Sequence, residues 1–190
     1  MTTEKLTLGS LFDGSGSFPF GGILAGIEPK WNSDMPGLGH ITVSISHHDR
    51  CAAVSVSAIP HGVDIELVRP VNGRLFPRVF SPEELAVCGG LSDGRQEEYF
   101  FRIWTRKEAL IKTGAITLGG MHTVYADGDT LSYRGNTHYF YTYSSGPLTP
   151  GCILSVCSRG TPAGPVLYTA DRTSKLDAAA VLDRLYFDKQ

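Results

Sequence analysis

Three acidic residues and one lysine have the spacing of a site for a divalent cation and an anionic substrate. In Gly62–Glu66 apolar and acidic residues alternate, which is the pattern of a strand with one buried face. Asp64 and Glu66 therefore point to the same side, about 7 Å apart along the strand. Two carboxylates this close repel each other, and a hard cation such as Mg²⁺ between them relieves the repulsion.

A second segment, residues 104–112, adds a third carboxylate and the lysine. Helical spacing places Trp104, Glu108 and Ile111 at positions i, i+4 and i+7. Lys112 follows Glu108 by four residues, so the two side chains share one face of the helix. A lysine beside oxygen ligands for Mg²⁺ suits an anionic, phosphorylated substrate. Either segment alone is also typical of a wet edge strand or a solvated helix.

A third segment, Val43–Asp49, precedes the other two and contains the pair Ser46-His47. Together the three segments resemble the 4′-phosphopantetheinyl transferase superfamily, whose members carry a Ser-His pair, a G-[IV]-D-[IVL]-E strand and a W-x-x-K-E-A-x-x-K helix in this order. The match runs from about Ile41 to Gly114, and the chain is similar to a compact surfactin-type enzyme. The resemblance implies an α+β fold of two similar halves, each with an antiparallel sheet packed on a long helix.

The hydrophobic and turn patterns predict the elements that position these residues. Ser81 and Glu84 have the spacing of a capping box and Pro82 suits a first helical turn, so a short helix begins there. A long helix over residues 95–113 should end at Gly114. We also expect strands at 41–45 and 51–58 around a turn at 47–50, strands at 63–67, 131–133, 139–143 and 152–157, and helices at 22–27 and 174–186.

Length and composition indicate one soluble globular domain of 190 residues. The implied halves would cover residues 1–60, with a shortened N-terminal part, and residues 61–165. A hydrophobic content of 42%, a charged content of 19% and a net charge of −2 give no attraction to nucleic acid or anionic membranes. The sequence lacks a long apolar run and a signal-peptide pattern, so we expect a cytoplasmic protein that does not bind membranes. The four cysteines lack the spacing of a zinc site.

The resemblance implies a transferase that moves 4′-phosphopantetheine from coenzyme A to a serine of an acyl or peptidyl carrier protein. The second product would be adenosine 3′,5′-bisphosphate, and the carrier would serve fatty-acid, polyketide or nonribosomal peptide biosynthesis. Asp64, Glu66 and Glu108 are the expected ligands of Mg²⁺, with Mn²⁺ as a substitute. Lys112 matches the last lysine of the helix motif and would contact the phosphates. We expect such an enzyme to act as a monomer, with an oligomer as the alternative.

Further residues would complete the coenzyme A site. Ser46 and His47 match the Ser-His pair, and His47 would donate a hydrogen bond to the pyrophosphate; without the resemblance, His47 is an ordinary turn histidine. Lys107, on the flank of the long helix, could contact the pantetheine arm or the carrier. About forty-five residues precede the Ser-His pair, fewer than in the larger surfactin-type enzymes. This difference leaves His48 and Arg50 as candidates to hold the 3′-phosphate of coenzyme A.

A general base is needed to remove the proton from the carrier serine. In related enzymes a glutamate on a short helix between the second and third motifs has this role, and the F-S-x-x-E spacing places Glu84 there. The alternative is that Glu84 is only the capping partner of Ser81, because a carboxylate at a helix N-terminus is a weaker base. Glu108, acting through a metal-bound water, would then be the base.

The segment at residues 69–80 has the composition of a docking surface for an acidic carrier. Arg74 and Arg78 could steer the carrier, and Phe76 could be a buried anchor. The alternative is an ordinary loop whose aromatic side chains pack in the core, which we expect for Phe80.

Two other functions could use the same residues. A magnesium-dependent phosphohydrolase or nuclease would use Asp64, Glu66 and Glu108 without a docking segment, and a nuclease would be expected to show a basic stripe, which this chain lacks. A non-catalytic descendant that binds a carrier or coenzyme A is the third option, which the shortened N-terminal part favours weakly and the intact acidic triad opposes.

Overall fold

The computed structural model describes residues 7–8, 28–29, 42–48, 51–144, 150–160 and 164–165. The chain divides into two compact units, residues 41–167 and the remainder, residues 1–40 with 168–190. In the smaller unit β1 (Thr7–Leu8) and β2 (Glu28–Pro29) form a parallel pair. The helices expected at 22–27 and 174–186, as well as Arg50, lie outside the described residues. The symmetry of two halves stays a prediction.

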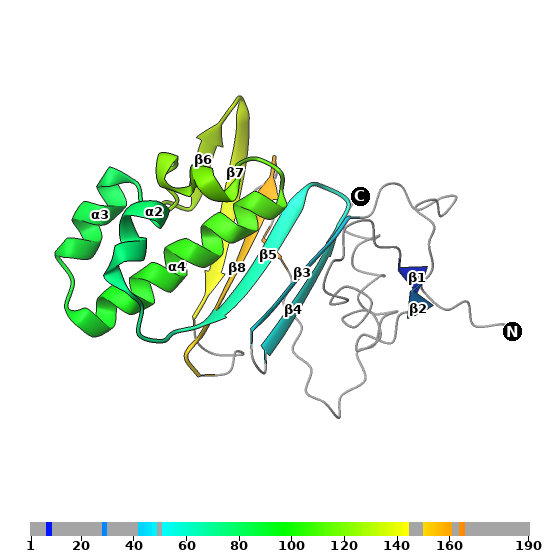
Figure 1. The fold of residues 1–190 in the computed structure, drawn as a ribbon. Helices are drawn as coiled ribbons and strands as arrows, with labels where there is room; N and C mark the ends of the chain where they lie inside the picture. Colours follow the sequence, from blue (N-terminus) through cyan, green and yellow to red (C-terminus); the bar gives the residue numbers. More distant parts are fainter. Residues whose placement is uncertain are drawn as a thin grey trace, which may run out of the picture. The chain divides into compact units, whose positions relative to one another are not determined.

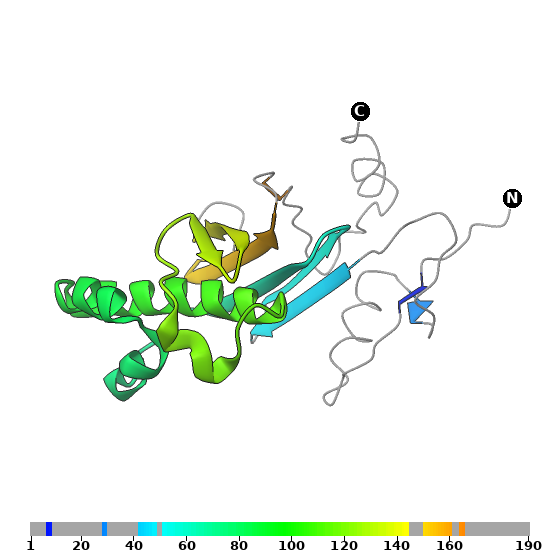
Figure 2. The ribbon, with the colours of Figure 1, turned by 90° about the horizontal axis from the view of Figure 1, so that it is seen from above.

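The larger unit is built on a four-stranded antiparallel sheet with a long helix across one face (Figure 1). The strand order is β5 (His61–Leu67), β8 (Cys152–Arg159), β7 (Asn136–Tyr143) and β6 (Thr130–Tyr133). Helix α4 (Asp93–Lys112) packs against β5, β8 and β7. Figure 2, seen from above, shows the helices gathered on this face of the sheet. The α+β fold expected from the resemblance is confirmed for the described residues.

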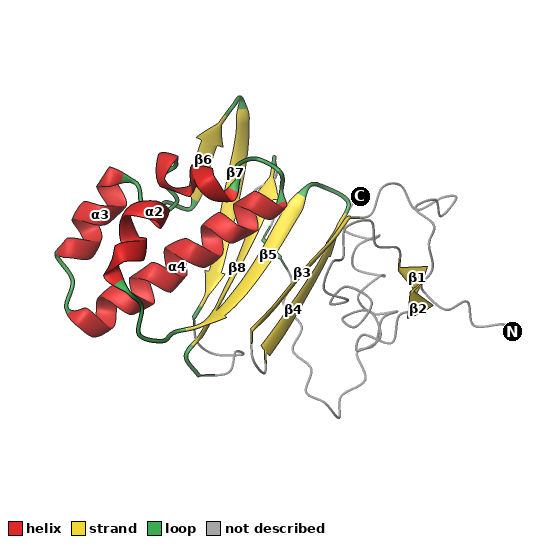
Figure 3. Cartoon of the chain, in the orientation of Figure 1, coloured by secondary structure: helices red, strands yellow, loops and turns green. Residues whose placement is uncertain are grey.

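Short helices complete the helical layer (Figure 3). Together with α4 they enclose an aromatic core. They are η1 (Gly73–Leu75), α2 (Phe76–Val79), α3 (Pro82–Gly89) and η2 (Leu118–Thr123). Phe80, Phe100 and Ile103 are almost completely buried in this core. The tilted and edge-on ring contacts, such as Phe80 with Phe100 at 5.7 Å between ring centroids, are the arrangement that aromatic rings prefer.

The helix ends follow the predicted signals. The backbone N–H of Ser81 donates to Glu84 Oε2 at 2.8 Å, and the N–H of Glu84 donates to Ser81 Oγ at 3.3 Å, so the capping box is confirmed. Gly114 has a φ of +79°, which glycine adopts without strain at a helix end. None of the helices in the described part of the chain is long and apolar enough to cross a membrane.

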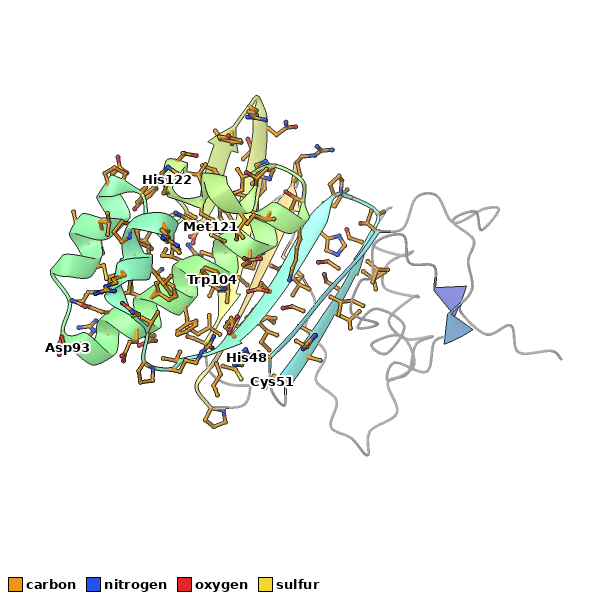
Figure 4. All side chains as sticks on the ribbon, viewed as in Figure 1. His48, Cys51, Asp93, Trp104, Met121 and His122 are labelled. Carbon is orange, nitrogen blue, oxygen red and sulfur yellow. The ribbon has the colours of Figure 1, made fainter. Side chains whose placement is uncertain are left out.

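A separate hairpin lies beside the sheet. Strands β3 (Thr42–His48) and β4 (Cys51–Ser57) pair antiparallel, with His48 opposite Cys51, and both residues are labelled at the turn end of the hairpin in Figure 4. The predicted hairpin is confirmed, although His47 and His48 belong to β3 rather than to the turn. Strand β3 runs along β5 in the same direction, and serine side chains of β3 bind the backbone of β5.

Candidate active site between β5 and the end of α4

The site forms where β5 passes under the last turns of α4, and Gly62 permits this close approach. A Cβ atom at position 62 would lie 2.0 Å from the carbonyl oxygen of Ala109 and 2.8 Å from Cβ of Lys112. Any larger residue would have to push the helix away from the strand. The glycine of the strand motif therefore sets the distance between the carboxylates of β5 and the residues Glu108 and Lys112 on α4.

Asp64 is the centre of the site. Its side chain is buried, and Oδ1 accepts hydrogen bonds from Lys112 Nζ at 2.9 Å and from Ser46 Oγ at 2.7 Å. Lys112 Nζ also donates to the carbonyl oxygen of Val63 at 2.7 Å. The second oxygen of Asp64, Oδ2, is buried and has no hydrogen-bond partner among the described residues. A buried oxygen without a partner costs about 1–3 kcal/mol, so this atom indicates a place for a ligand.

The carboxylates of the site influence one another. Burial raises the pKa of Asp64, and the charge of Glu66 raises it further, while Lys112 and Ser46 act in the opposite direction. Burial also raises the pKa of Glu108, and the nearby charge of Asp64 adds to this effect. The charges of the strand and the helix are therefore close enough to influence one another, and a cation would compensate them.

The carboxylate of Glu66 binds residues other than those around Asp64. Its Oε2 lies 2.8 Å from the Arg69 guanidinium and 3.0 Å from Nδ1 of His48, so the carboxylate forms an ion pair at the edge of the site. Among the described residues, no group of three or more histidine, cysteine, aspartate and glutamate side chains is arranged to hold a metal ion. Asp64 has one oxygen without a partner among the described residues, whereas Oε2 of Glu66 is bound by Arg69 and His48. The three carboxylates stay predicted cation ligands.

The Ser-His pair is divided between the two faces of β3. Ser46 is buried and directed to Asp64, while the neighbouring His47 is exposed. This alternation follows from the pleat of a strand. The single hydroxyl proton of Ser46 is used by Asp64, and His48 binds Glu66. Contacts of Ser46, His47 and His48 with coenzyme A stay predictions.

Lys107 does not belong to this site, and its predicted contact with coenzyme A or the carrier is wrong. The side chain is completely buried. Its ammonium group donates to Glu84 Oε2 at 2.5 Å, to the carbonyl oxygen of Val79 at 2.7 Å and to that of Met121 at 3.0 Å. All three protons of the ammonium are therefore used within the core.

The prediction of Glu84 as the general base is also wrong. Glu84 is completely buried, and its Oε1 accepts from the backbone N–H of Ala126 at 2.6 Å. Its Oε2 accepts from Lys107 and from the N–H of Ser81. A carboxylate whose oxygens are both bound and shielded from solvent cannot meet a serine of another protein. The alternative, a capping residue, is the role that the structure shows.

The predicted docking segment covers η1 and α2. Arg74 and Arg78 are exposed, and Leu75 is 40% exposed between them. Phe76 is half-buried, because its ring packs at 5.4 Å from Phe80 and at 5.5 Å from Phe100. The burial expected for Phe80 is confirmed. A role in docking stays a prediction.

Two contributors to the site were not found from the sequence. Arg69, which binds Glu66, follows it by three residues and belongs to the segment predicted for docking rather than to the three site motifs. Ser44 binds the backbone N–H of Val63 at 3.0 Å. The period-2 spacing of Ser44 and Ser46 on one strand was the available signal, because residues at this spacing share a face.

The sequence of this chain is similar to those of known proteins. Residues 60–127 match the model of the 4′-phosphopantetheinyl transferase superfamily. The chain is 26% identical over 132 residues to the 4′-phosphopantetheinyl transferase Sfp of Bacillus subtilis (strain 168), which covers 65% of this chain and 58% of the relative. It is 36% identical over 125 residues to the 4′-phosphopantetheinyl transferase psf-1 of Bacillus pumilus, covering 61% and 52%.

A third relative is the 4′-phosphopantetheinyl transferase AcpT of Escherichia coli (strain K12), 49% identical over 88 residues, which covers 45% of this chain and 43% of the relative. The chain thus spans about half the length of the curated relatives that it matches. The matched residues 60–127 contain Gly62, Asp64, Glu108 and Lys112. The resemblance of this chain to the 4′-phosphopantetheinyl transferase superfamily is therefore confirmed.

Proposed function

We propose that this chain transfers the 4′-phosphopantetheine group of coenzyme A to a serine of an acyl or peptidyl carrier protein. The observation that carries the proposal is the Asp64 carboxylate, which Lys112 and Ser46 hold by one oxygen while the other is buried without a partner among the described residues. In the reaction the serine oxygen forms a bond to the β-phosphorus of coenzyme A. The pyrophosphate bond breaks, adenosine 3′,5′-bisphosphate leaves, and the serine proton passes to a base.

Lys112 would bind the pyrophosphate. Its side chain is 28% exposed while its ammonium remains 2.9 Å from Asp64, so the charge lies at the boundary between the site and solvent. A positive charge here would attract the phosphates and offset the charge that grows on the leaving group. Positioning and electrostatic stabilisation of this kind supply most of the rate enhancement in phosphoryl transfer.

The donor set fits a divalent cation such as Mg²⁺ or Mn²⁺. Asp64 offers its unpartnered oxygen, and Glu108 offers a carboxylate whose pKa is raised by burial and by Asp64. Glu66 would join them by exchanging its ion pair with Arg69 for the cation. When Mg²⁺ is bound, it supplies charge neutralisation on the pyrophosphate oxygens. Oxygen ligands of this type are the ones that Mg²⁺ prefers.

Glu108 is the carboxylate best suited to accept the serine proton. Burial and the charge of Asp64 raise its pKa, which makes the ionised form a stronger base at neutral pH. It is half-buried, whereas Glu84 is completely buried. The carrier itself would approach over Arg74 and Arg78, whose exposed charges suit an acidic partner.

Intact-mass spectrometry tests the proposal. The protein is incubated with coenzyme A, Mg²⁺ and an apo carrier protein, and the carrier should gain the mass of one phosphopantetheine. Asp64→Ala, which removes the central carboxylate, is the matched control and should leave the carrier in its apo form. Hydrolysis of coenzyme A without a modified carrier would favour a phosphohydrolase. Binding without any reaction would favour a non-catalytic descendant.

A further inference from the structure

Strand β3 carries two serines in nearly equivalent positions along the edge of β5. Ser44 Oγ accepts a hydrogen bond from the backbone N–H of Val63 at 3.0 Å, and Ser46 Oγ accepts one from the N–H of Ile65 at 3.3 Å. Both serines are buried. Their hydroxyl oxygens take the place that carbonyl oxygens of a neighbouring strand would have, and so satisfy the donors of β5.

The two serines differ in one contact. Ser46 also donates its hydroxyl proton to Asp64 Oδ1 at 2.7 Å, which is the length of a charge-assisted O–H···O⁻ bond. No such contact to a carboxylate is described for Ser44. Ser44 is therefore a control for Ser46. Both serines accept a hydrogen bond from the backbone of β5, but among the described contacts only Ser46 donates one to a carboxylate.

We propose that Ser46 is a positioning residue, which orients the carboxylate of Asp64 so that Oδ2 is kept for a divalent cation. The terminal torsion of aspartate has a broad, roughly two-fold profile and does not select one orientation by itself. Lys112 binds the same Oδ1, but substrate phosphates would compete for its ammonium. The hydrogen bond from Ser46 is the contact that persists when Lys112 turns to the substrate.

This inference rests on the proposed function, but it concerns the cation site and can be tested before any transfer occurs. Loss of a residue that orients a metal ligand typically weakens metal affinity by about 10- to 100-fold. The probe is Mn²⁺ alone, whose free concentration is measured by electron paramagnetic resonance during titration of the full chain. Asp64→Ala defines the part of the binding that depends on this site.

Ser46→Ala should weaken Asp64-dependent Mn²⁺ binding by about 10-fold or more. Ser44→Ala loses the equivalent backbone bond, so it should show a comparable change in melting temperature but a change in Mn²⁺ affinity of less than about 2-fold. Ser46→Thr keeps the hydroxyl and should restore affinity to within about 3-fold of the wild type. Both alanine variants retain β-strand backbone geometry, and circular dichroism verifies their fold.

Equal Mn²⁺ affinities in Ser46→Ala and Ser44→Ala would overturn the proposal, as would wild-type Mn²⁺ binding that does not depend on Asp64. A failure of the proposed function is distinguishable from both results. If Mn²⁺ affinity falls selectively in Ser46→Ala while the wild type transfers no phosphopantetheine, the positioning role holds and the transfer reaction is the part that is wrong. If transfer occurs and the two alanine variants bind Mn²⁺ equally, only the positioning role fails.

Discussion

Helix α4 presents two lysines, five residues apart, to two carboxylates in different environments. Lys107 and Glu84 are both completely buried, and every described polar atom of the pair has a partner. Lys112 and Asp64 are 28% and 8% exposed, and one oxygen of Asp64 has no partner among the described residues. Each pair consists of one lysine and one carboxylate. Among the described residues, only the Asp64–Lys112 pair has a buried oxygen atom without a hydrogen-bond partner, and this atom could bind a ligand.

The difference shows how completeness of hydrogen bonding separates a purely structural pair from a pair that has an oxygen atom free to bind a ligand. Five residues turn an α-helix by about 500°, so the two lysines point about 140° apart. Lys107 enters the aromatic core, where the carbonyl groups of Val79 and Met121 take its remaining protons. Lys112 reaches β5, where its ammonium binds the carbonyl oxygen of Val63 and its side chain remains partly exposed to solvent. The following predictions test this contrast.

The largest effect should come from breaking the buried pair. Lys107→Met leaves the carboxylate of Glu84 buried without its counter-charge, which should lower the free energy of unfolding by about 3–5 kcal/mol. Urea denaturation measures this change. The matched variant Lys112→Met removes a partly exposed lysine and should cost far less stability. Similar losses in the two variants would remove the distinction between the pairs.

The second effect concerns catalysis at the open pair. Asp64→Ala should lower the rate of phosphopantetheine transfer at least about 10²-fold, the scale of losing a preorganised electrostatic contact. The rate is measured by intact mass of the carrier, and circular dichroism verifies that the variant is folded. Lys112→Ala should also weaken the binding of coenzyme A. Wild-type turnover in folded Asp64→Ala would contradict the assignment of this pair to the site.

A third, smaller effect should come from the exposed segment that contains Arg74 and Arg78, next to the buried pair of Lys107 and Glu84. Arg78 precedes Val79, whose carbonyl oxygen binds Lys107, so the core pair supports the exposed segment. Combining Arg74→Glu with Arg78→Glu should raise the KM for an acidic carrier by about 10-fold without changing the affinity for coenzyme A. Wild-type activity should decline with salt, because exposed charges are screened beyond about 8 Å at physiological ionic strength. An unchanged carrier KM in the folded double variant would place docking elsewhere.

The smallest effect should be a gain in stability when the charge of Glu108 is removed. The pKa of Glu108 is raised in the folded state, chiefly by burial, so its ionised form opposes folding. Stability should therefore fall as pH rises from the ordinary glutamate range through the raised value. At pH 7 without divalent cations, Glu108→Gln should raise the free energy of unfolding by about 0.5–1 kcal/mol, although activity is lost. Glu84→Gln, the control of opposite sign, should instead lower it by an amount similar to that of Lys107→Met, because Lys107 loses its counter-charge.

Thermal unfolding at pH 4 and pH 7 measures the gain in stability of Glu108→Gln and the loss of stability of Glu84→Gln. The gain in Glu108→Gln should shrink at pH 4, where the wild-type carboxylate is largely protonated. Mg²⁺ should also narrow the difference at pH 7, because a cation stabilises the ionised form. A gain that persists unchanged at pH 4 would show that charge is not its cause.

Much of the local structure could be predicted from the residues themselves. The capping box of Ser81 and Glu84 and the helix end at Gly114 depend on neighbours within a few positions, and both are confirmed. The strand expected at 63–67 is also confirmed, but the single buried face that its alternation predicted is wrong, because residues 61–65 are all buried. Burial of Phe80 is confirmed as well, and it was expected because phenylalanine is among the residues most often buried. Such features are set by backbone sterics and by hydrogen bonds that span one turn.

The partners of charged side chains depended on contacts between segments far apart in the chain. Periodicity showed that Lys107 and Lys112 lie on different sides of one helix, but not which side enters the core. That choice was made by carbonyl groups 28 and 14 residues away, at Val79 and Met121, which surround Lys107. Likewise, the contact of Ser46 with Asp64 spans 18 residues. Sequence by itself determined which residues could carry charge on each face, and only the tertiary structure decided which charges were neutralised and which stayed open to a ligand.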